Sequence, residues 1–267
     1  MHERPPETTS EAIPKPASDE VVIWRYMDFT KFVALLETAA LFFARISHLD
    51  DPFEGSFPKS QPPLSRFLQL LPKNFLPEGV EVAHMPSPGL LEYGRAMRNW
   101  TMVNCWHAVE HESAAMWSLY GNGIAIRSTV GRLRSALGVP PAVSDEFFDK
   151  GQFHIGMVEY IDYDNSHISP VHGAAQFFRK RRSFEHEKEL RAVIMQLPVD
   201  AKRWLDYSRH FDDPGKTFSV DLKTLICAIR IATQAPGWYS DLVSKVTARY
   251  GVELTPQQSD LDAEPLY

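Results

Sequence analysis

A charged run that leads into an apolar segment constrains the fold of this chain more than any other feature. Residues 184–191 read Phe-Glu-His-Glu-Lys-Glu-Leu-Arg, and Ala-Val-Ile-Met follows at 192–195. Because successive side chains of a strand point to opposite faces, a strand here carries apolar side chains on one face and three charges on the other, Glu187, Glu189 and Arg191. The pattern predicts a buried strand whose entrance holds either a functional site or a cluster of ion pairs.

Composition limits the class of protein. The chain has 267 residues, of which 44% are hydrophobic and 23% charged, a globular balance that suits one large domain. Its formal net charge of -6 offers no general attraction to nucleic acid. Cys105 and Cys227 lie in apolar runs, so we expect reduced core residues rather than a disulfide.

Residues 1–19 are polar and rich in proline, which predicts a disordered or loosely attached arm. The arm lacks a signal-peptide pattern, and no apolar stretch in the chain approaches the length of a membrane span. We therefore expect a cytoplasmic protein that does not bind a membrane.

Beyond the arm, strand and helix patterns are mixed at irregular spacing. Strands are expected at 21–26, 40–45, 100–106, 123–127, 153–161, 189–196, 225–232 and 252–254, and helices from Phe29, at 112–120, 129–137 and 173–183, and after Pro236. The proline-rich residues 57–100 indicate an insertion with short helical pieces around 64–71 and 89–100. The mixture predicts a single α+β domain over residues 20–267, with a mixed sheet, surrounding helices and this insertion.

A tight turn at 49–55 contains two candidate carboxylates, Asp51 and Glu54. An aspartate before a proline commonly accepts hydrogen bonds from the backbone amides of its own turn, which is a structural role. Glu54 has no such local role, and Phe53 would hold the loop against the sheet. Either carboxylate could therefore be structural or could bind a ligand.

Trp117 and Tyr120 lie on the short helix predicted after Glu112. Aromatic side chains at this spacing belong most often to a hydrophobic core. The alternative is a platform on which a nucleobase or a nicotinamide ring stacks.

The segment His107-Ala-Val-Glu-His111 matches the H-x-x-E-H pattern of inverted zinc proteases. That chemistry requires both histidines on one face of a helix, with the glutamate as the base. Here a strand ends just before the pattern and a helix starts just after it, so we expect a connecting loop and no metal site. A zinc hydrolase remains the least favoured function.

The basic run Arg179-Lys-Arg-Arg182 invites a nucleic-acid interpretation, but in an acidic chain such a run is more often a solvated helix face. A nuclease of the D/E-x-K type is disfavoured, because His186 stands two residues before Lys188. The chain also has neither a P-loop nor a G-x-G-x-x-G motif, which excludes the common nucleotide-binding loops.

Four segments together give the chain a family resemblance. In order they are Trp24-Arg-Tyr26, Leu49-Asp-Asp-Pro-Phe-Glu54, Met116-Trp-Ser-Leu-Tyr-Gly121 and Phe184-Glu-His-Glu-Lys-Glu-Leu-Arg191. On these motifs the chain resembles a bacterial family designated domain of unknown function 2971, from residue 21 to the C-terminus. The resemblance marks a set of positions without assigning an activity: Asp51, Glu54, Trp117, Tyr120, Lys180, Glu187, Glu189 and Arg191.

A thinner resemblance points to the ADP-ribosyltransferase superfamily. There, an arginine or histidine on the first strand holds the dinucleotide, an aromatic helix stacks the nicotinamide, and a glutamate before a late strand polarises the ribose. Arg25, the Trp117/Tyr120 helix and Glu187 or Glu189 stand in that order here, with Tyr26 and Lys180 as further binding candidates. The resemblance implies an enzyme that uses NAD as a substrate, with no other cofactor. The alternative is a non-catalytic module that binds a small ligand or a protein.

Overall fold

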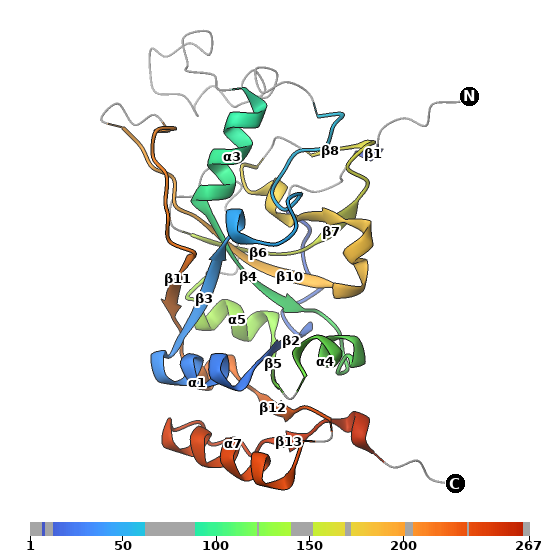
Figure 1. Ribbon diagram of the computed structural model, residues 1–267, viewed down its shortest axis with the longest axis vertical. Helices are drawn as coiled ribbons and strands as arrows, with labels where there is room; N and C mark the ends of the chain where they lie inside the picture. Colours follow the sequence, from blue (N-terminus) through green and yellow to red (C-terminus); the bar gives the residue numbers. More distant parts are fainter. Residues whose placement is uncertain are drawn as a thin grey trace, which may run out of the picture.

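A mixed sheet of nine strands lies at the centre of the molecule (Figure 1). The computed structural model describes residues 7–8, 13–61, 89–121, 123–139, 152–168, 172–200, 205–233 and 235–263. Within these ranges the main path through the sheet is β11 (Gly215–Ser219), β3 (Ala40–Arg45), β4 (Thr101–His107), β2 (Val22–Met27), β5 (Ile124–Thr129), β12 (Ala228–Ile231) and β13 (Gln257–Gln258). Two further strands, β10 (Glu189–Met195) and β6 (Phe153–Met157), extend the sheet from β4. The predicted single α+β domain with a mixed sheet is confirmed.

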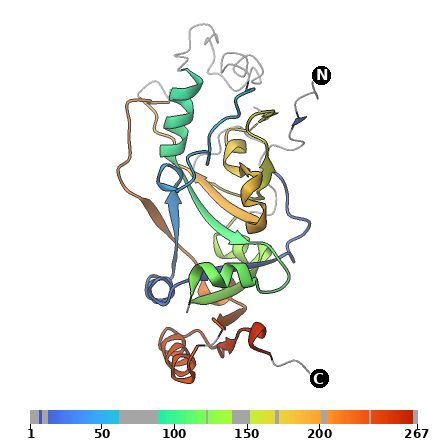
Figure 2. The ribbon, with the colours of Figure 1, turned by 45° about the vertical axis from the view of Figure 1, so that its right-hand side comes forward.

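Helices and short ribbons surround this sheet. The helices are α1 (Phe29–Thr38), α3 (Leu90–Trp100), α4 (Ala114–Tyr120), α5 (Val130–Ala136), α6 (Leu222–Leu225) and α7 (Gly237–Arg249). Short 3-10 helices are η1 (Ile46–His48), η4 (Ala175–Phe178), η5 (Arg182–Glu187) and η6 (Asp260–Asp262). Two small ribbons pair β1 (Glu7–Thr8) with β8 (Ser166–His167), and β7 (Glu159–Ile161) with β9 (Arg179–Arg181). Figures 1 and 2 place α3 and α7 at opposite ends of the long axis.

The connectivity around β4 divides the sheet. One edge of β4 pairs along its whole length with β10, from Thr101 opposite Met195 to His107 opposite Glu189. The other edge is shared, because β3 pairs with β4 only at Met102 and Val103, and β2 pairs with it only at His107. The strands β3 and β2 therefore diverge, and a gap opens along residues 104–106 of β4.

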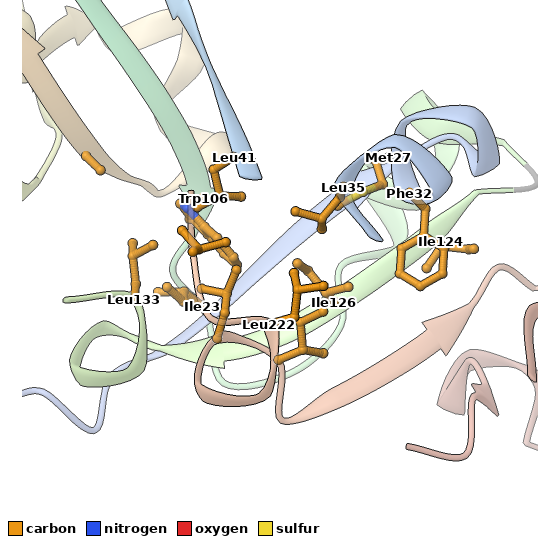
Figure 3. Packing of buried hydrophobic residues seen from close by; sticks show 14 of the residues in the cluster. Ile23, Met27, Phe32, Leu35, Leu41, Trp106, Ile124, Ile126, Leu133 and Leu222 are labelled. Atoms are coloured by element: carbon orange, nitrogen blue, oxygen red, sulfur yellow. The ribbon is translucent and has the colours of Figure 1, made fainter. Parts of the chain in front are cut away.

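The larger hydrophobic core covers one face of the sheet. It joins α1, α5, α6 and α7 to strand residues such as Ile23, Ile124 and Ile126, and Figure 3 shows part of this packing. Helix α1 begins where Asp28 accepts a hydrogen bond from the Lys31 amide at 2.7 Å, which satisfies a free donor of the first turn. Its side chains at helical spacing, Phe32, Leu35 and Leu36, then pack into this core.

A second core covers the opposite face, beneath α3 and η4. Val193 and Met195 of β10 lie in it, whereas Leu190, Ala192 and Ile194 belong to the first core. The period-two alternation predicted for this strand is therefore confirmed, with Glu189 and Arg191 on the face of Val193. Since β10 is buried on both faces, its first two charges have to be paired within the protein.

Several predicted elements differ from the observed ones. The helix expected at 173–183 is wrong, because η4, β9 and η5 occupy that segment and four consecutive residues, 175–178, are buried. The expectation of a solvated basic face is wrong for Arg179, which is buried in β9; Lys180, which the family motif sets apart from that face, is buried beside it. Strand β11 was not predicted. The strand expected at 252–254 is not formed, and the last strand of the sheet, β13, lies instead at 257–258.

The expected arm and insertion are described only in part. Residues 13–19 lie against the sheet, because Ile13 is buried and the Pro14 carbonyl accepts a hydrogen bond from the Met157 amide at 2.7 Å. The helical piece expected at 89–100 is α3, and that expected at 64–71 lies outside the described residues. None of the helices in the described ranges has the length and apolar character needed to cross a bilayer.

Candidate functional site

A pocket of about 750 Å³ occupies the gap between β3 and β2. Its walls come from β2, β3, β4 and α1, from the turn at 49–54, and from the segment 180–191. Alternation along β2 places Arg25 on the face of Ile23 and Met27, which belong to the first core, whereas Glu189 and Arg191 lie on the other face. The pocket therefore joins the two faces of the sheet, which a continuous ladder would have separated.

The pocket collects nearly all of the predicted site residues. Those that line it are Arg25, Tyr26, Asp51, Glu54, Tyr120, Lys180, Glu187, Glu189 and Arg191. Trp117 is the exception, because its ring is buried in a small core and its Nε1 donates to Glu112 Oε2 at 2.9 Å. All four sequence motifs thus contribute side chains to one pocket.

Four of these residues form a closed network of charges. Lys180 Nζ lies 2.7 Å from Glu189 Oε1 and 3.3 Å from Glu54 Oε1. The Arg191 guanidinium contacts Glu189 Oε2 at 2.6 Å and both oxygens of Glu54 at 2.8 and 2.9 Å. Each of the four side chains is at most 8% exposed. Their charges compensate one another in the interior, as buried ionic groups require.

Glu187 stands at the edge of this network. It ends η5 rather than lying on the strand, so the alternation that predicted its position applies only from Glu189 onward. Its carboxylate meets Lys180 Nζ at 2.6 Å, and its side chain is 22% exposed. The network therefore contains three carboxylates and two cations, and the carboxylate that faces the solvent is the one in excess.

Because the network has one more carboxylate than cations, the pKa values of Glu187 and Glu189 are shifted in opposite directions. Burial and, after it, the neighbouring Glu189 carboxylate raise the pKa of Glu187 to about 7, against the opposing effect of Lys180. Burial alone would also raise the pKa of Glu189, but the charges of Arg191 and Lys180 hold it well below its usual range. Glu189 is thus a fixed anion, whereas Glu187 can exchange a proton near neutral pH.

Arg25, on another wall of the pocket, is a cation without a paired carboxylate among the described residues. Its Nη1 donates to the Cys105 carbonyl at 2.9 Å, in the stretch of β4 that the diverging strands leave open. Its guanidinium lies 5.9 Å from the centre of the Trp106 ring. Burial lowers the pKa of Arg25, and no carboxylate within the described ranges pairs with it. Several guanidinium donors are therefore available to an anion.

The turn at 49–55 is fastened to η5 by Arg181. Its guanidinium contacts both oxygens of Asp51, at 2.9 and 3.1 Å, and lies 4.6 Å from the Phe53 ring centre and 5.3 Å from that of Phe184. Asp51 also accepts a hydrogen bond from the Phe53 amide at 3.1 Å. The structural role that the sequence indicated for Asp51 is therefore present, and its contact with Arg181 ties the 49–55 turn to the segment that leads into η5, where Glu187 lies.

The aromatic side chains at the pocket come from β2 and α4. The rings of Tyr26 and Tyr120 lie nearly parallel with their centres 6.2 Å apart, and Tyr120 is 38% exposed. Helix α4 is held to β2 because the Tyr26 hydroxyl accepts a hydrogen bond from the Ser113 amide at 2.9 Å. Of the two predicted stacking residues, only Tyr120 presents its ring to the pocket.

The zinc-protease pattern is not formed. His107 ends β4, and Glu110 and His111 follow it in a loop, so the single helix that the chemistry needs is missing here. The described residues contain no group of three or more His, Cys, Asp or Glu side chains arranged to hold a metal ion. The loop expected for both histidines applies only to His111, since His107 belongs to the strand.

Sequence reasoning missed His107 and Trp106 as pocket residues. His107 lines the pocket opposite Glu189, and Trp106 lies beneath the Arg25 guanidinium. A signal was present, because the strand ends in three polarisable residues, Cys105-Trp-His107, next to a motif of the family.

Comparison of the chain with protein-family models, with curated proteins and with solved structures gives no match. The fold and the pocket are therefore interpreted from their own residues.

Proposed function

We propose that this protein cleaves the bond between nicotinamide and ribose in a nicotinamide dinucleotide, as a glycohydrolase or as an ADP-ribosyltransferase-like enzyme. One observation carries the proposal: a single pocket holds an arginine without an ion-pair partner among the described residues and a partly exposed carboxyl group whose pKa is about 7. The four motifs that meet at this pocket also support membership of the domain of unknown function 2971 family.

Arg25 would bind the pyrophosphate of the dinucleotide. A guanidinium that is partly withdrawn from water and lacks a carboxylate partner gains most from a bound anion, because charge-assisted hydrogen bonds strengthen at low dielectric. Since the pocket passes from one face of the sheet to the other, it suits an elongated ligand with its anionic part at one end and its reactive part at the other.

Tyr120 would stack on a ring of the ligand. Its position beside Tyr26 supports this role, because an exposed ring that is already aligned with another aromatic side chain loses little entropy on binding. Trp117 would not contact the ligand. Its buried ring and its hydrogen bond to Glu112 would instead hold α4, and with it Tyr120, in place.

Glu187 would accept a hydrogen bond from a ribose hydroxyl. As the bond between ribose C1 and nicotinamide breaks, its electron pair moves to the ring nitrogen and positive charge develops on the ribose. A carboxylate at the ribose stabilises that charge more than it stabilises the ground state, which is the condition for catalysis. Glu189 is less suited to this role, because both of its oxygens already contact Lys180 and Arg191.

The test is incubation of the purified protein with NAD, followed by mass spectrometry for nicotinamide, ADP-ribose and modified macromolecules. We expect release of nicotinamide by the wild type and a loss of about 10²–10⁴-fold in turnover for Glu187→Gln, whose folding is checked by its melting temperature. Free ADP-ribose would indicate the hydrolase, and a modified macromolecule the transferase. Absence of nicotinamide release at saturating dinucleotide would contradict the proposal.

A second candidate is a non-catalytic module that binds a small ligand or a protein. The observation that favours it is the internal pairing of Glu54, Lys180, Glu189 and Arg191, which a purely structural cluster would also show. Calorimetry separates the two candidates: dinucleotide binding without nicotinamide release supports the module, and binding with release supports the enzyme.

A further inference from the structure

We infer that His107 is the group that takes the proton from the attacking water or hydroxyl group in this pocket, an inference that rests on the proposed function. His107 is the last residue of β4. There it pairs with Glu189 of β10 on one edge and with Trp24 of β2 on the other, and its side chain lines the pocket. Neither the four family motifs nor the ADP-ribosyltransferase resemblance assigns it a role, and the zinc-protease pattern that contains it is not formed.

The ring of His107 has a defined tautomer. His107 Nδ1 is hydrogen-bonded to the backbone carbonyl of Glu187. Because a carbonyl oxygen only accepts, Nδ1 carries the hydrogen, and in the neutral ring Nε2 keeps its lone pair. Nε2 has no hydrogen-bond partner among the described residues and is not among the buried unsatisfied atoms. A basic nitrogen is therefore available at the surface of the pocket.

The His107 ring is also held next to Glu187. Beside its hydrogen bond to the Glu187 carbonyl lies a backbone bond in which the Ala108 amide donates to the Lys188 carbonyl at 2.8 Å. The base is thus fixed to the turn whose carboxyl group would hold the ribose. On the side of β2, the Tyr26 ring borders the His107 ring, and the two ring centres lie 6.3 Å apart.

The charged surroundings favour the neutral ring. Burial lowers the pKa of His107, and Lys188 and His186 from the η5 side lower it further, whereas the Glu187 carbonyl and the Glu189 carboxylate act in the opposite direction. From β2 the nearest titratable groups are Tyr26 and the Arg25 guanidinium, which bonds the carbonyl of Cys105 two residues away. The ring is therefore unprotonated at neutral pH, which a proton acceptor requires.

The nucleophile's oxygen bonds to ribose C1 while the bond from C1 to the nicotinamide nitrogen breaks, and that bond's electron pair stays on the nitrogen. His107 Nε2 receives the nucleophile's proton and later releases it to solvent. With water as the nucleophile, the products are ADP-ribose, neutral nicotinamide and one proton, and no oxidant or reductant is consumed.

The experiment compares His107→Asn with His111→Asn. Asparagine places an amide N–H near the position of Nδ1, so it can keep the bond to the Glu187 carbonyl, but it lacks a basic nitrogen. We expect His107→Asn to lose about 10²–10⁴-fold in kcat, while an acidic limb set by the ionisation of Glu187 should remain in the pH–rate profile. Its dinucleotide affinity should stay within about threefold of the wild type. His111 is exposed in the following loop, and its replacement should leave kcat unchanged.

Two results would overturn the inference. One is a wild type that releases nicotinamide while His107→Asn keeps more than half of its kcat, which would leave the proposed function intact. The other needs no variant: nitrogen NMR of the wild-type protein should show the hydrogen of His107 on Nδ1, and finding it on Nε2 would remove the base. A wild type without nicotinamide release would remove the proposed function and this inference together.

Discussion

The pocket has two polar regions that handle charge in opposite ways. In the closed region, Glu54, Lys180, Glu189 and Arg191 are nearly inaccessible, and each charge lies within 3.3 Å of an opposite one. In the open region, Arg25 keeps guanidinium donors, His107 keeps the lone pair of Nε2 and Glu187 keeps a carboxyl group at the wall of the pocket. The contrast separates a scaffold from the groups it positions. The four scaffold charges compensate one another in the interior, whereas Arg25, Glu187 and the buried His107 keep polar atoms at the wall of the pocket.

The largest effect is expected from breaking the closed region with Glu189→Gln. The substitution removes the anion that lies between Lys180 and Arg191 and leaves the two cations with less compensation in the interior. Removing one member of a buried ion pair costs about 3–5 kcal/mol in the free energy of unfolding. For a chain of this size that lowers the melting temperature by roughly 2–4 °C per kcal/mol. Denaturant unfolding measures the loss.

Glu187→Gln is the matched control, because it replaces the same side chain two residues earlier, where the carboxylate is partly exposed. Its unfolding free energy should change by about 1 kcal/mol or less, as expected for the loss of a partly exposed pair. Equal destabilisation by the two variants would mean that the two regions are one network.

Arg25→Met should have a smaller effect on the protein and a clear one on the ligand. Stability should be unchanged or slightly higher, because burial already disfavours this charge and no carboxylate compensates it within the described residues. Dinucleotide affinity should fall by about 1.5–3 kcal/mol, the value of hydrogen bonds to a charged group. Calorimetric titration measures the affinity.

Arg127→Met provides the control for this variant. Arg127 lies on the neighbouring strand β5 with its guanidinium 5.9 Å from the Trp24 ring centre, as Arg25 lies 5.9 Å from that of Trp106, but it does not line the pocket. An equal loss of affinity in both variants would show that Arg25 acts through the general positive charge of the surface.

The sequence could predict what depends on local periodicity. Period two placed Glu189 and Arg191 on one face of β10, and the spacing from Phe29 to Leu36 gave α1. The motifs also named most of the residues that meet in the pocket. These features are local because each follows from the geometry of one strand or one helix.

What the sequence could not supply depends on contacts between distant segments. The surroundings of Arg25 depend on where β3 and β2 leave β4, and no local sequence pattern indicates that divergence. The helix predicted at 173–183 failed for a related reason. Arg179 is buried against Glu159 at 3.1 Å and Lys180 against three glutamates, so tertiary ion pairs override the amphipathic pattern that basic residues usually indicate.

The smallest effect concerns the acidity of Glu187 and sharpens the boundary between the two regions. A carboxyl group whose pKa is about 7 in the folded protein and about 4.5 in the unfolded chain holds its proton more tightly when folded. Its contribution to stability is therefore complete below pH 4.5 and is lost as the pH rises to about 7. His107 titrates in an overlapping range with the opposite sign, because burial lowers its pKa and the unfolded chain binds its proton more tightly.

The difference between the wild type and Glu187→Gln cancels the contribution of His107 and isolates that of Glu187. Denaturant unfolding at several pH values from 4.5 to 8 should show the variant gaining stability relative to the wild type as the pH rises, and the gain should level off above about pH 7. The gain should remain smaller than the loss caused by Glu189→Gln, since Glu187 is partly exposed and keeps Lys180 as a partner in its ionised form. A constant difference across this range would mean that Glu187 titrates as an ordinary surface carboxylate, and the pocket would then lack a carboxyl group that changes its charge near neutral pH.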